Sequence, residues 1–118
     1  MGDTQDTVQN LVSELKRGTL VLSVLSQLAE PQYGYSLVQR LAERGLDIEQ
    51  GTLYPLLRRL EKQELLDSDW SLEENRPRRY YRLSTKGKRV LTHLHREWDA
   101  LVGVLDRLLE EEGKDGTH

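Results

Sequence analysis

The feature that most constrains this chain is an apolar stripe near its C-terminus, repeated every three or four residues. Its members are Leu91, Leu94, Trp98, Leu101, Leu105 and Leu108. Such spacing places all six on one face of a helix, as in a heptad repeat. At 1.5 Å per residue, a helix over residues 86-112 would be roughly 40 Å long. A 118-residue chain cannot cover that length with its own core, so the stripe predicts a homodimer formed through this helix.

Four shorter helices are predicted before this stripe. The first has an apolar face made of Val8, Leu11, Val12 and Leu15. The second runs from Thr19 to Ala29 before Pro31, and the third from Tyr35 to Arg44 before Gly45, because proline and glycine end helices. The fourth has the clearest helical stripe, made of Leu53, Leu56, Leu57 and Leu60. Pro55 fits this helix in its first turn, where an amide has no intrahelical partner.

Apolar residues that alternate with polar ones predict three strands. Leu46 and Ile48 alternate with acids, which indicates a very short strand over residues 46–49. After Gln63 the period is again two, with Leu66, Trp70 and Leu72 facing one way. A turn over residues 74–77 leads to a third strand, whose Tyr81 and Leu83 face the core while Tyr80 faces outward. Ser84 or Thr85 can cap the final helix.

Charge is distributed unevenly along the chain. The net charge is −3, yet the segment from Asn75 to Arg89 contains seven basic residues and no acid. The segment from Glu97 to Asp115 reverses this balance, with seven acids against two bases. Salt screens each patch beyond about 10 Å, so the basic segment can attract phosphate although the whole chain is acidic.

The order of these elements is that of a winged helix-turn-helix, a mainly α fold with a small β-hairpin wing (α+β). Burying the leucines of the fourth helix leaves a polar face for a DNA major groove, made of Thr52, Tyr54, Arg58, Arg59 and Lys62. The wing adds Arg76, Arg78 and Arg79. Tyr35 and Ser36 begin the third helix, where they can contact a phosphate or serve packing. Exposed arginines more often only keep a protein surface soluble. Here they occur on both the fourth helix and the wing, the two elements that a winged helix presents to DNA, which favours double-stranded DNA as a partner.

Four segments resemble the PadR family of transcriptional regulators. They are Leu15–Leu20, Tyr33–Tyr35, Gly51–Glu61 with its GTLYPLL motif, and Arg76–Ser84. The resemblance is to the short branch of the family, and it implies a dimeric repressor that binds palindromic promoter DNA. Glu64 departs from the pattern, because the family usually has glycine there. Either Glu64 adopts a left-handed backbone, at a cost of about 1 kcal/mol, or the helix ends differently.

These observations divide the chain into four parts. We expect residues 1-14 to form an arm that contributes to the dimer, residues 15-85 the DNA-binding domain, residues 86-112 the dimerisation helix, and residues 113-118 a disordered tail. The arm would bring Val8, Leu11 and Leu15 to the interface. Trp98 either packs in the dimer core or, with its symmetry mate, lines a pocket for a small aromatic effector.

Other function classes find little support. There are no cysteines, and no catalytic set, metal site or cofactor motif is recognisable, so we expect a protein that is not an enzyme. The absence of a long apolar run and of a signal peptide predicts a cytoplasmic protein without a membrane partner. One alternative stays open, namely a winged-helix interaction module whose C-terminal helix docks a partner protein without specific DNA binding.

Overall fold

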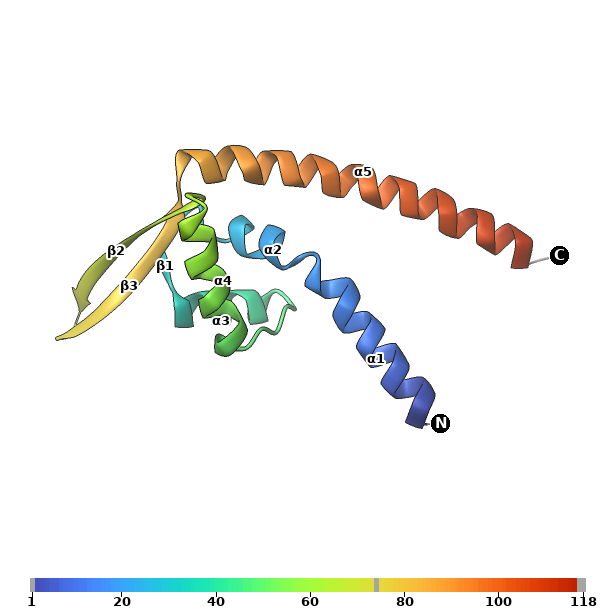
Figure 1. The fold of residues 1–118 in the computed structure, drawn as a ribbon, viewed down its shortest axis with the longest axis horizontal. Helices are drawn as coiled ribbons and strands as arrows, with labels where there is room; N and C mark the ends of the chain where they lie inside the picture. Colours follow the sequence, from blue (N-terminus) through green and yellow to red (C-terminus); the bar gives the residue numbers. More distant parts are fainter. Residues whose placement is uncertain (1, 74, 117–118) are drawn as a thin grey trace.

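The computed structural model describes residues 2–73 and 75–116, which form five helices and three strands (Figure 1). In chain order they are α1 (Gly2–Arg17), α2 (Leu20–Ser26), β1 (Gln32–Tyr33), α3 (Gly34–Glu43), α4 (Gln50–Lys62), β2 (Leu66–Glu73), β3 (Arg76–Leu83) and α5 (Thr85–Gly116). The four short helices, the hairpin and the long final helix were all predicted. The fold is therefore the winged helix-turn-helix that the sequence indicates.

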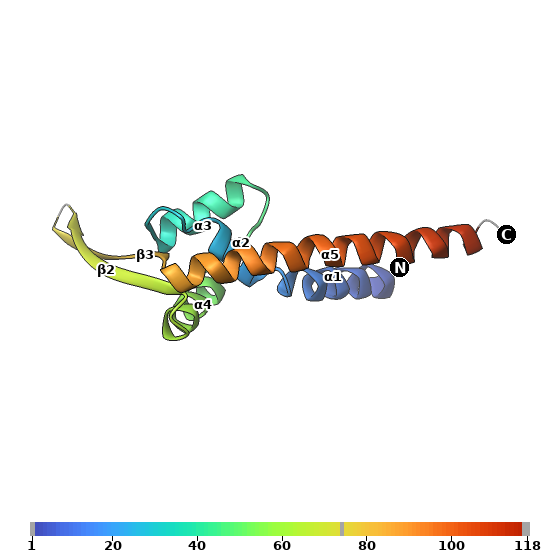
Figure 2. The same ribbon diagram turned by 90° about the horizontal axis from the view of Figure 1, so that it is seen from above.

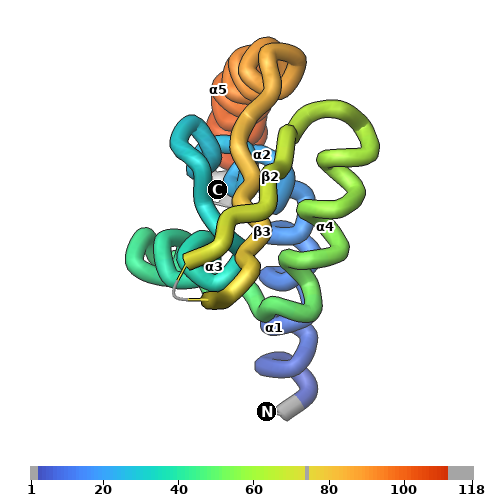
Figure 3. The backbone as a smooth tube through the Cα atoms, turned by 90° about the vertical axis from the view of Figure 1, so that its left-hand side faces the viewer, coloured from blue at the N-terminus to red at the C-terminus, as the bar shows by residue number. Residues whose placement is uncertain are grey.

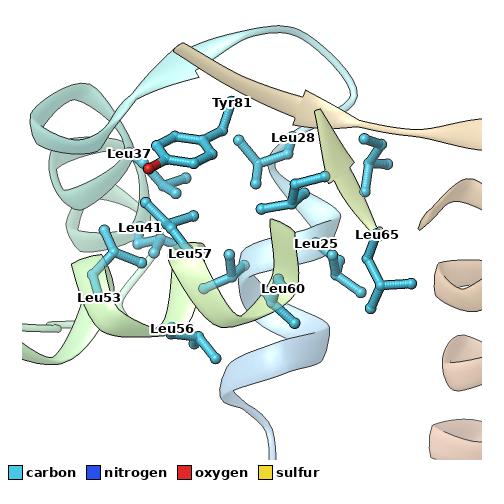
Figure 4. Packing of buried hydrophobic residues seen from close by; sticks show 13 residues of the cluster. Leu25, Leu28, Leu37, Leu41, Leu53, Leu56, Leu57, Leu60, Leu65 and Tyr81 are labelled. Carbon is cyan, nitrogen blue, oxygen red and sulfur yellow. The ribbon is translucent and has the colours of Figure 1, made fainter. Parts of the chain in front are cut away.

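The core lies where α2, α3 and α4 meet the inner face of the sheet (Figure 4). It consists of Val24, Leu25, Leu28, Leu37, Leu41, Leu53, Leu56, Leu57, Leu60, Leu65, Leu66, Tyr81 and Leu83. The predicted leucine stripe of α4 is wholly buried, and Tyr81 and Leu83 face the core as expected. Seen from the wing, α3 and α4 lie on opposite sides of the hairpin, with α5 above it (Figure 3).

The sheet has the order β1-β3-β2 and is antiparallel throughout. The strand predicted over residues 46–49 is wrong, because Gln32 and Tyr33 occupy the free edge of β3 instead. Leu46 and Ile48 do alternate toward the core, but as irregular chain. The amide of Leu46 donates to the Leu41 carbonyl at 2.9 Å, so it closes the end of α3 rather than joining a sheet. The alternation of apolar and polar residues indicates which side chains are buried, and it can occur in a segment that pairs with no strand.

The wing turns more tightly than predicted. Glu73 pairs with Arg76, so Pro77 lies within β3 opposite Leu72 and not in the turn. A proline is tolerated there because β1 pairs only with Tyr80 and Tyr81, which leaves the outer half of β3 as an edge. Asn75 supplies the turn with a positive φ of 63°. Glu74, the other predicted turn residue at the tip, lies outside the described residues.

The start of α4 also differs from the prediction. The helix begins at Gln50, so Pro55 lies in the second turn and not in the first. At that position its nitrogen cannot donate to the Gly51 carbonyl, and one intrahelical hydrogen bond is missing. Gly51 is exposed, with nothing within 4 Å of the position of a β-carbon. The helix nevertheless continues past the proline to Lys62.

The backbone at the end of α4 shows why the family usually has glycine where this chain has Glu64. The Glu64 amide donates to the Glu61 carbonyl at 2.9 Å, and the Leu65 amide donates to the Leu60 carbonyl at 3.0 Å. This pair of bonds is a Schellman motif, which requires a left-handed residue at Glu64. Glu64 indeed has a φ of 66°. Both apolar ends of the motif, Leu60 and Leu65, are buried.

Helix α5 begins after a side-chain cap and extends beyond the domain. The Ser84 hydroxyl accepts a hydrogen bond from the Gly87 amide at 2.9 Å, which confirms the predicted cap. The helix continues to Gly116, so the predicted disordered tail over residues 113-118 is wrong for 113–116, and 117–118 lie outside the described residues. Once a helix is nucleated, each added residue gains a hydrogen bond. This gain allows α5 to continue beyond the glutamates near its end.

Two helical arms, α1 and α5, leave the domain on the side opposite the wing (Figures 1 and 2). Only the first turns of α5 pack on the core, through Val90, Leu91 and Leu94. No helix in the described part of the chain has both the length and the apolar character that a bilayer crossing demands.

Replacing Glu64 with glycine is expected to stabilise the protein. Glycine adopts the left-handed backbone without steric cost, so E64G should raise the free energy of unfolding by about 1 kcal/mol. E64A is the matched control, because it removes the same charge but keeps the β-carbon. Urea unfolding would contradict this explanation of the α4 cap if E64A gained as much stability as E64G.

Candidate nucleic-acid interface

Helix α4 presents the polar face predicted from its sequence. With its four leucines buried, Thr52, Arg58, Arg59 and Lys62 are exposed, while Tyr54 is half-buried. Neither Arg58 nor Arg59 forms an ion pair with a carboxylate in the described part of the chain. Their guanidinium groups are therefore available to a ligand from solution.

A cleft separates the N-terminal half of α4 from the wing, and the start of α3 closes one end of it. We call it the aromatic–arginine cleft. Its aromatic lining consists of Tyr33, Tyr35, Tyr54, Trp70 and Tyr81. Its basic lining consists of Arg58, Arg78 and Arg79. Gly34 completes the wall, and the cavity has a volume of about 240 Å³. Among the residues that the structure describes, no acidic side chain lines it.

Tyr54 is positioned by a glycine in the neighbouring helix. A β-carbon on Gly34 would lie 2.2 Å from Tyr54 Cε1 and 2.9 Å from Cζ. Only glycine therefore lets the phenol ring lie flat against the first turn of α3. This contact holds the ring at the border between the core and the cleft, and it ties α4 to α3.

An ion pair ties the wing to α4. Arg79 Nη2 donates to Glu61 Oε1 at 2.7 Å, and Arg79 Nε donates to the Ser68 hydroxyl at 3.0 Å. The Ser68 hydroxyl also donates to Glu61 Oε2. All three side chains are partly buried, which strengthens charge-assisted hydrogen bonds. Glu61 is thus neutralised although it lies on the helix predicted to meet DNA.

The same arginine stacks between two aromatic rings. The guanidinium carbon of Arg79 lies 5.8 Å from the centre of the Trp70 ring and 5.6 Å from that of Tyr81. Burial raises the pKa of the Tyr81 phenol, and the nearby Arg79 charge partly offsets this effect. Arg79 was predicted to contact DNA, and the structure gives it partners within the protein.

A further aromatic and basic cluster surrounds Tyr33 and shares Tyr33 and Arg78 with the cleft. The Arg78 guanidinium carbon lies 4.5 Å from the centre of the Tyr33 ring, and the Tyr33 and Tyr80 rings meet edge to face at 5.6 Å. The Tyr80 hydroxyl donates to Glu73 Oε1 at 2.8 Å, and this bond to a carboxylate raises the pKa of Tyr80. Tyr80 therefore faces outward as predicted and makes intramolecular contacts.

Other predicted DNA contacts are placed at the margins of this surface. Arg76 is exposed near the wing tip, and Tyr35 is exposed in the first turn of α3. The Ser36 hydroxyl is occupied within the chain, with the Tyr33 carbonyl and the Gln32 side-chain oxygen each 2.9 Å away. Thr52 lies on the opposite side of α4 from the wing, in a hollow shared with Arg17 and Arg59. The structure thus brings together Tyr35, Tyr54, Arg58, Arg78 and Arg79.

Sequence reasoning missed three residues of this site. Trp70 lies beyond the core on β2 and is 67% exposed, and Tyr33 forms part of β1. Trp70 belonged to an alternating segment, where the pattern favoured packing, whereas the two residues of β1 are too few to give a periodic signal. Glu61 was treated only as part of a motif. Its partner Arg79 lies 18 positions further along the chain, so no local pattern indicated the pair.

The predicted dimer residues fall into two groups. Leu91 and Leu94 are partly buried against the domain's own core. The others remain exposed in this single chain, namely Val8, Leu11, Leu15, Trp98, Leu101, Leu105 and Leu108. Among the described residues, no three His, Asp or Glu side chains converge in a way that suits a metal ion.

Comparisons with known proteins agree on one family. The model of the transcriptional regulator PadR-like family matches residues 21–93. The crystal structure of a PadR family transcriptional regulator from Eggerthella lenta is 50% identical, covers 93% of this chain and 98% of its own, and has a TM-score of 0.89. A transcriptional regulator of Mycobacterium tuberculosis is 36% identical over 90 residues, which are 75% of this chain and 84% of that protein.

One further structural neighbour was solved with DNA. It is PadR of Bacillus subtilis, in complex with operator DNA, and it is 18% identical to this chain with a TM-score of 0.61. The match covers 64% of this chain and 45% of that one. At this identity the likeness concerns the fold alone.

Adding a methyl group at Gly34 should displace Tyr54. Because the new β-carbon would overlap the phenol ring, G34A is expected to lower the free energy of unfolding by about 1–3 kcal/mol. In a Y54A background the overlap is absent, so the same change should cost far less. Urea unfolding of the four proteins measures this coupling. Equal losses in both backgrounds would show that Gly34 matters for some reason other than Tyr54.

Proposed function

Because the chain belongs to the PadR-like family of transcriptional regulators, we propose that it is a sequence-specific repressor that binds a palindromic promoter site as a homodimer. The observation that carries the proposal is the surface shared by α4 and the wing. There, Arg58 and Arg78 flank a cleft without acidic lining, and Arg59 and Lys62 extend the basic surface along α4. Acting on chromosomal DNA, such a repressor would work in the cytoplasm.

Helix α4 and the wing would contact different parts of the DNA. Helix α4 exposes the side chains of Arg58 and Arg59, which suit hydrogen bonding to base edges in the major groove. On the wing Arg76 is exposed and Arg78 is half-buried beside Tyr33, and both suit phosphates or the minor groove. The Glu61–Arg79 pair would keep the wing at a fixed distance from α4, so that both reach the duplex together.

Dimerisation is proposed from the apolar surface that the two arms leave uncovered. On α5, Leu101, Leu105 and Leu108 lie beyond the domain and are exposed, and on α1 Leu15 is 72% exposed. Contiguous apolar patches of this kind mark an interface, and the heptad spacing of α5 favours a second copy of the same helix. A two-fold dimer would present two copies of α4, which supports a palindromic site.

A small aromatic effector would be accommodated between the subunits. Trp98 lies on the α5 stripe with 39% of its surface exposed, and in the proposed dimer its symmetry mate would face it. Two indoles at such an interface suit a flat aromatic compound, which would release the repressor by moving the two α4 helices. A compound bound there would change Trp98 fluorescence in a W70F protein, and unchanged emission across a broad panel would contradict this part of the proposal.

The salt dependence of DNA binding tests the assignment of the arginines. If Lys62, Arg76 and Arg78 each neutralise one phosphate per subunit, about six phosphates per dimer give a slope near −5 in log K against log salt. R78A should reduce this slope to about −3.5, because two of those contacts are lost. Filter binding or fluorescence anisotropy at several salt concentrations provides the measurement.

The matched control replaces both members of an ion pair, so that one negative and one positive charge are removed together. E61Q combined with R79Q leaves the net charge unchanged, so the slope should stay near that of the wild type while affinity falls because the wing is released from α4. A slope that R78A leaves unaltered would show that the wing does not contact phosphate. Binding that is weak and equal for all sequences would favour the interaction module over the repressor.

Breaking the α5 stripe should separate the subunits. L105E places a charge within the proposed interface, where an unpaired ion is costly to bury, so the mass in solution should fall from that of a dimer to that of one chain. R96E is the control, because position 96 lies on the opposite face of the heptad. Analytical ultracentrifugation measures the mass. A wild-type monomer, or an L105E protein that remains dimeric, would contradict the proposed interface.

A further inference from the structure

We propose that the wing carries an apolar wedge, formed by Leu72 and Pro77, which enters the minor groove of bound DNA and bends the duplex. The inference rests on the proposed function, because its partner is the same DNA that α4 contacts. The wedge has an effect that the arginines do not have. A charged side chain holds the phosphate backbone, whereas an apolar side chain can part stacked base pairs.

The apolar side chains of the wing share one face of the hairpin. Residues directly opposite each other on paired strands lie on the same face of a sheet, and this face consists of the cross-strand pairs Leu66–Leu83, Ser68–Tyr81, Trp70–Arg79 and Leu72–Pro77. The face points toward α4, because the Arg79 side chain reaches Glu61 of that helix. Among the described residues of the hairpin, the acids lie on the other face.

Burial decreases along this face from the core to the tip of the wing. Leu66 and Leu83 at its base are buried, whereas Trp70 is 67% exposed and Leu72 is 71% exposed. Pro77, which pairs with Leu72, is exposed as well. The apolar pattern therefore continues beyond the region that the core covers. A leucine and a proline side by side near the tip lose their contact with water only when a partner outside the domain covers them.

The position of the pair indicates that this partner is DNA. The arms that carry the proposed dimer interface leave the domain on the side opposite the wing, so a second copy bound there lies far from Leu72 (Figures 1 and 2). Arg76, beside Pro77, is exposed. A basic residue next to an apolar pair matches a minor groove, where phosphates border base edges that accept an apolar group. Neither Leu72 nor Pro77 lines the aromatic–arginine cleft.

The hairpin is held firmly enough to act as a wedge. Residues Leu66–Glu73 pair with Arg76–Leu83 along their whole length, and the ring of Pro77 fixes its φ. The hydrogen bonds that join Glu61, Arg79 and Ser68 hold the hairpin to α4. A wedge at a fixed distance from α4 reaches the same base step in every half-site. Because pyrimidine–purine steps unstack most easily, a TA or CA/TG step at that position should bind best.

The test measures binding and bending on one gel. DNA fragments of equal length carry the inverted repeat selected from the genomic DNA, either in the middle or near one end. A shifted band reports binding by the full-length protein. A bent complex migrates more slowly when the site is in the middle, and we expect a bend of about 20–90° for each wedge. In the same duplex, 2-aminopurine in place of single adenines should brighten at one unstacked step beside each half-site.

Three variants separate the wedge from the charges around it. L72S shortens the exposed side chain and makes it polar, so the complex should form but lose most of its bend and its 2-aminopurine signal. L72M keeps an apolar side chain of similar volume and should retain both. R76A is the matched control on the neighbouring charge, because it should weaken binding and leave the bend at saturation unchanged. Thermal unfolding confirms that each variant is folded.

The outcomes distinguish this inference from the proposed function. A straight complex with the wild-type protein, or one that L72S bends as much as the wild type does, would overturn the wedge and leave the repressor standing. Loss of the bend in R76A as well as in L72S would assign the bending to phosphate contacts and would also overturn the wedge. A protein that shifts no DNA fragment would contradict the repressor proposal, and the wedge would fail with it.

Discussion

Burial of the α4 leucines is the constraint on which the rest of the molecule depends. Leu53, Leu56, Leu57 and Leu60 are covered by α2, α3 and the sheet. Each buried leucine is worth about 2 kcal/mol, whereas an exposed ion pair contributes about 0–1 kcal/mol. The orientation of α4 is therefore set by its leucines, and Arg58 and Arg59 face outward as a consequence.

The second determinant is how the wing is fixed relative to α4. A two-stranded hairpin is only marginally stable by itself, and the outer half of β3 pairs with β2 alone. The Glu61–Arg79–Ser68 hydrogen bonds, together with Trp70 and Tyr81 around the guanidinium, join the hairpin to the helix. These contacts shape the aromatic–arginine cleft, and they place an acidic residue near the proposed DNA surface without leaving it charged and unpaired.

The sequence predicted the helices well because their apolar residues recur with the period of the helix. At Glu64 the family resemblance indicated glycine and left two possibilities open, a left-handed residue or a different helix end, and the backbone is left-handed. The strand at residues 46–49 failed because alternation reveals burial but not which chain occupies the edge of β3. Two residues, Gln32 and Tyr33, take that edge, and a pattern so short carries no periodic signal.

The sequence predicted which residues form the binding surface, but not which of them contact one another. All three wing and helix arginines, Arg58, Arg78 and Arg79, were predicted to contact DNA. In the structure Arg58 is exposed, Arg78 is half-buried beside Tyr33, and Arg79 is neutralised by Glu61. The pairing joins residues 18 positions apart, which no local pattern reveals. Likewise, Trp70 becomes part of a cleft only because the wing folds beside α4.

Selection of bound fragments from the genomic DNA of the host, followed by sequencing, tests most directly whether a symmetric dimer reads DNA through α4 and the wing. Such a dimer should enrich an inverted repeat whose half-site centres are about one helical turn, or a whole number of turns, apart. Recovery of no preferred sequence, or of a single half-site without its inverted mate, would contradict it.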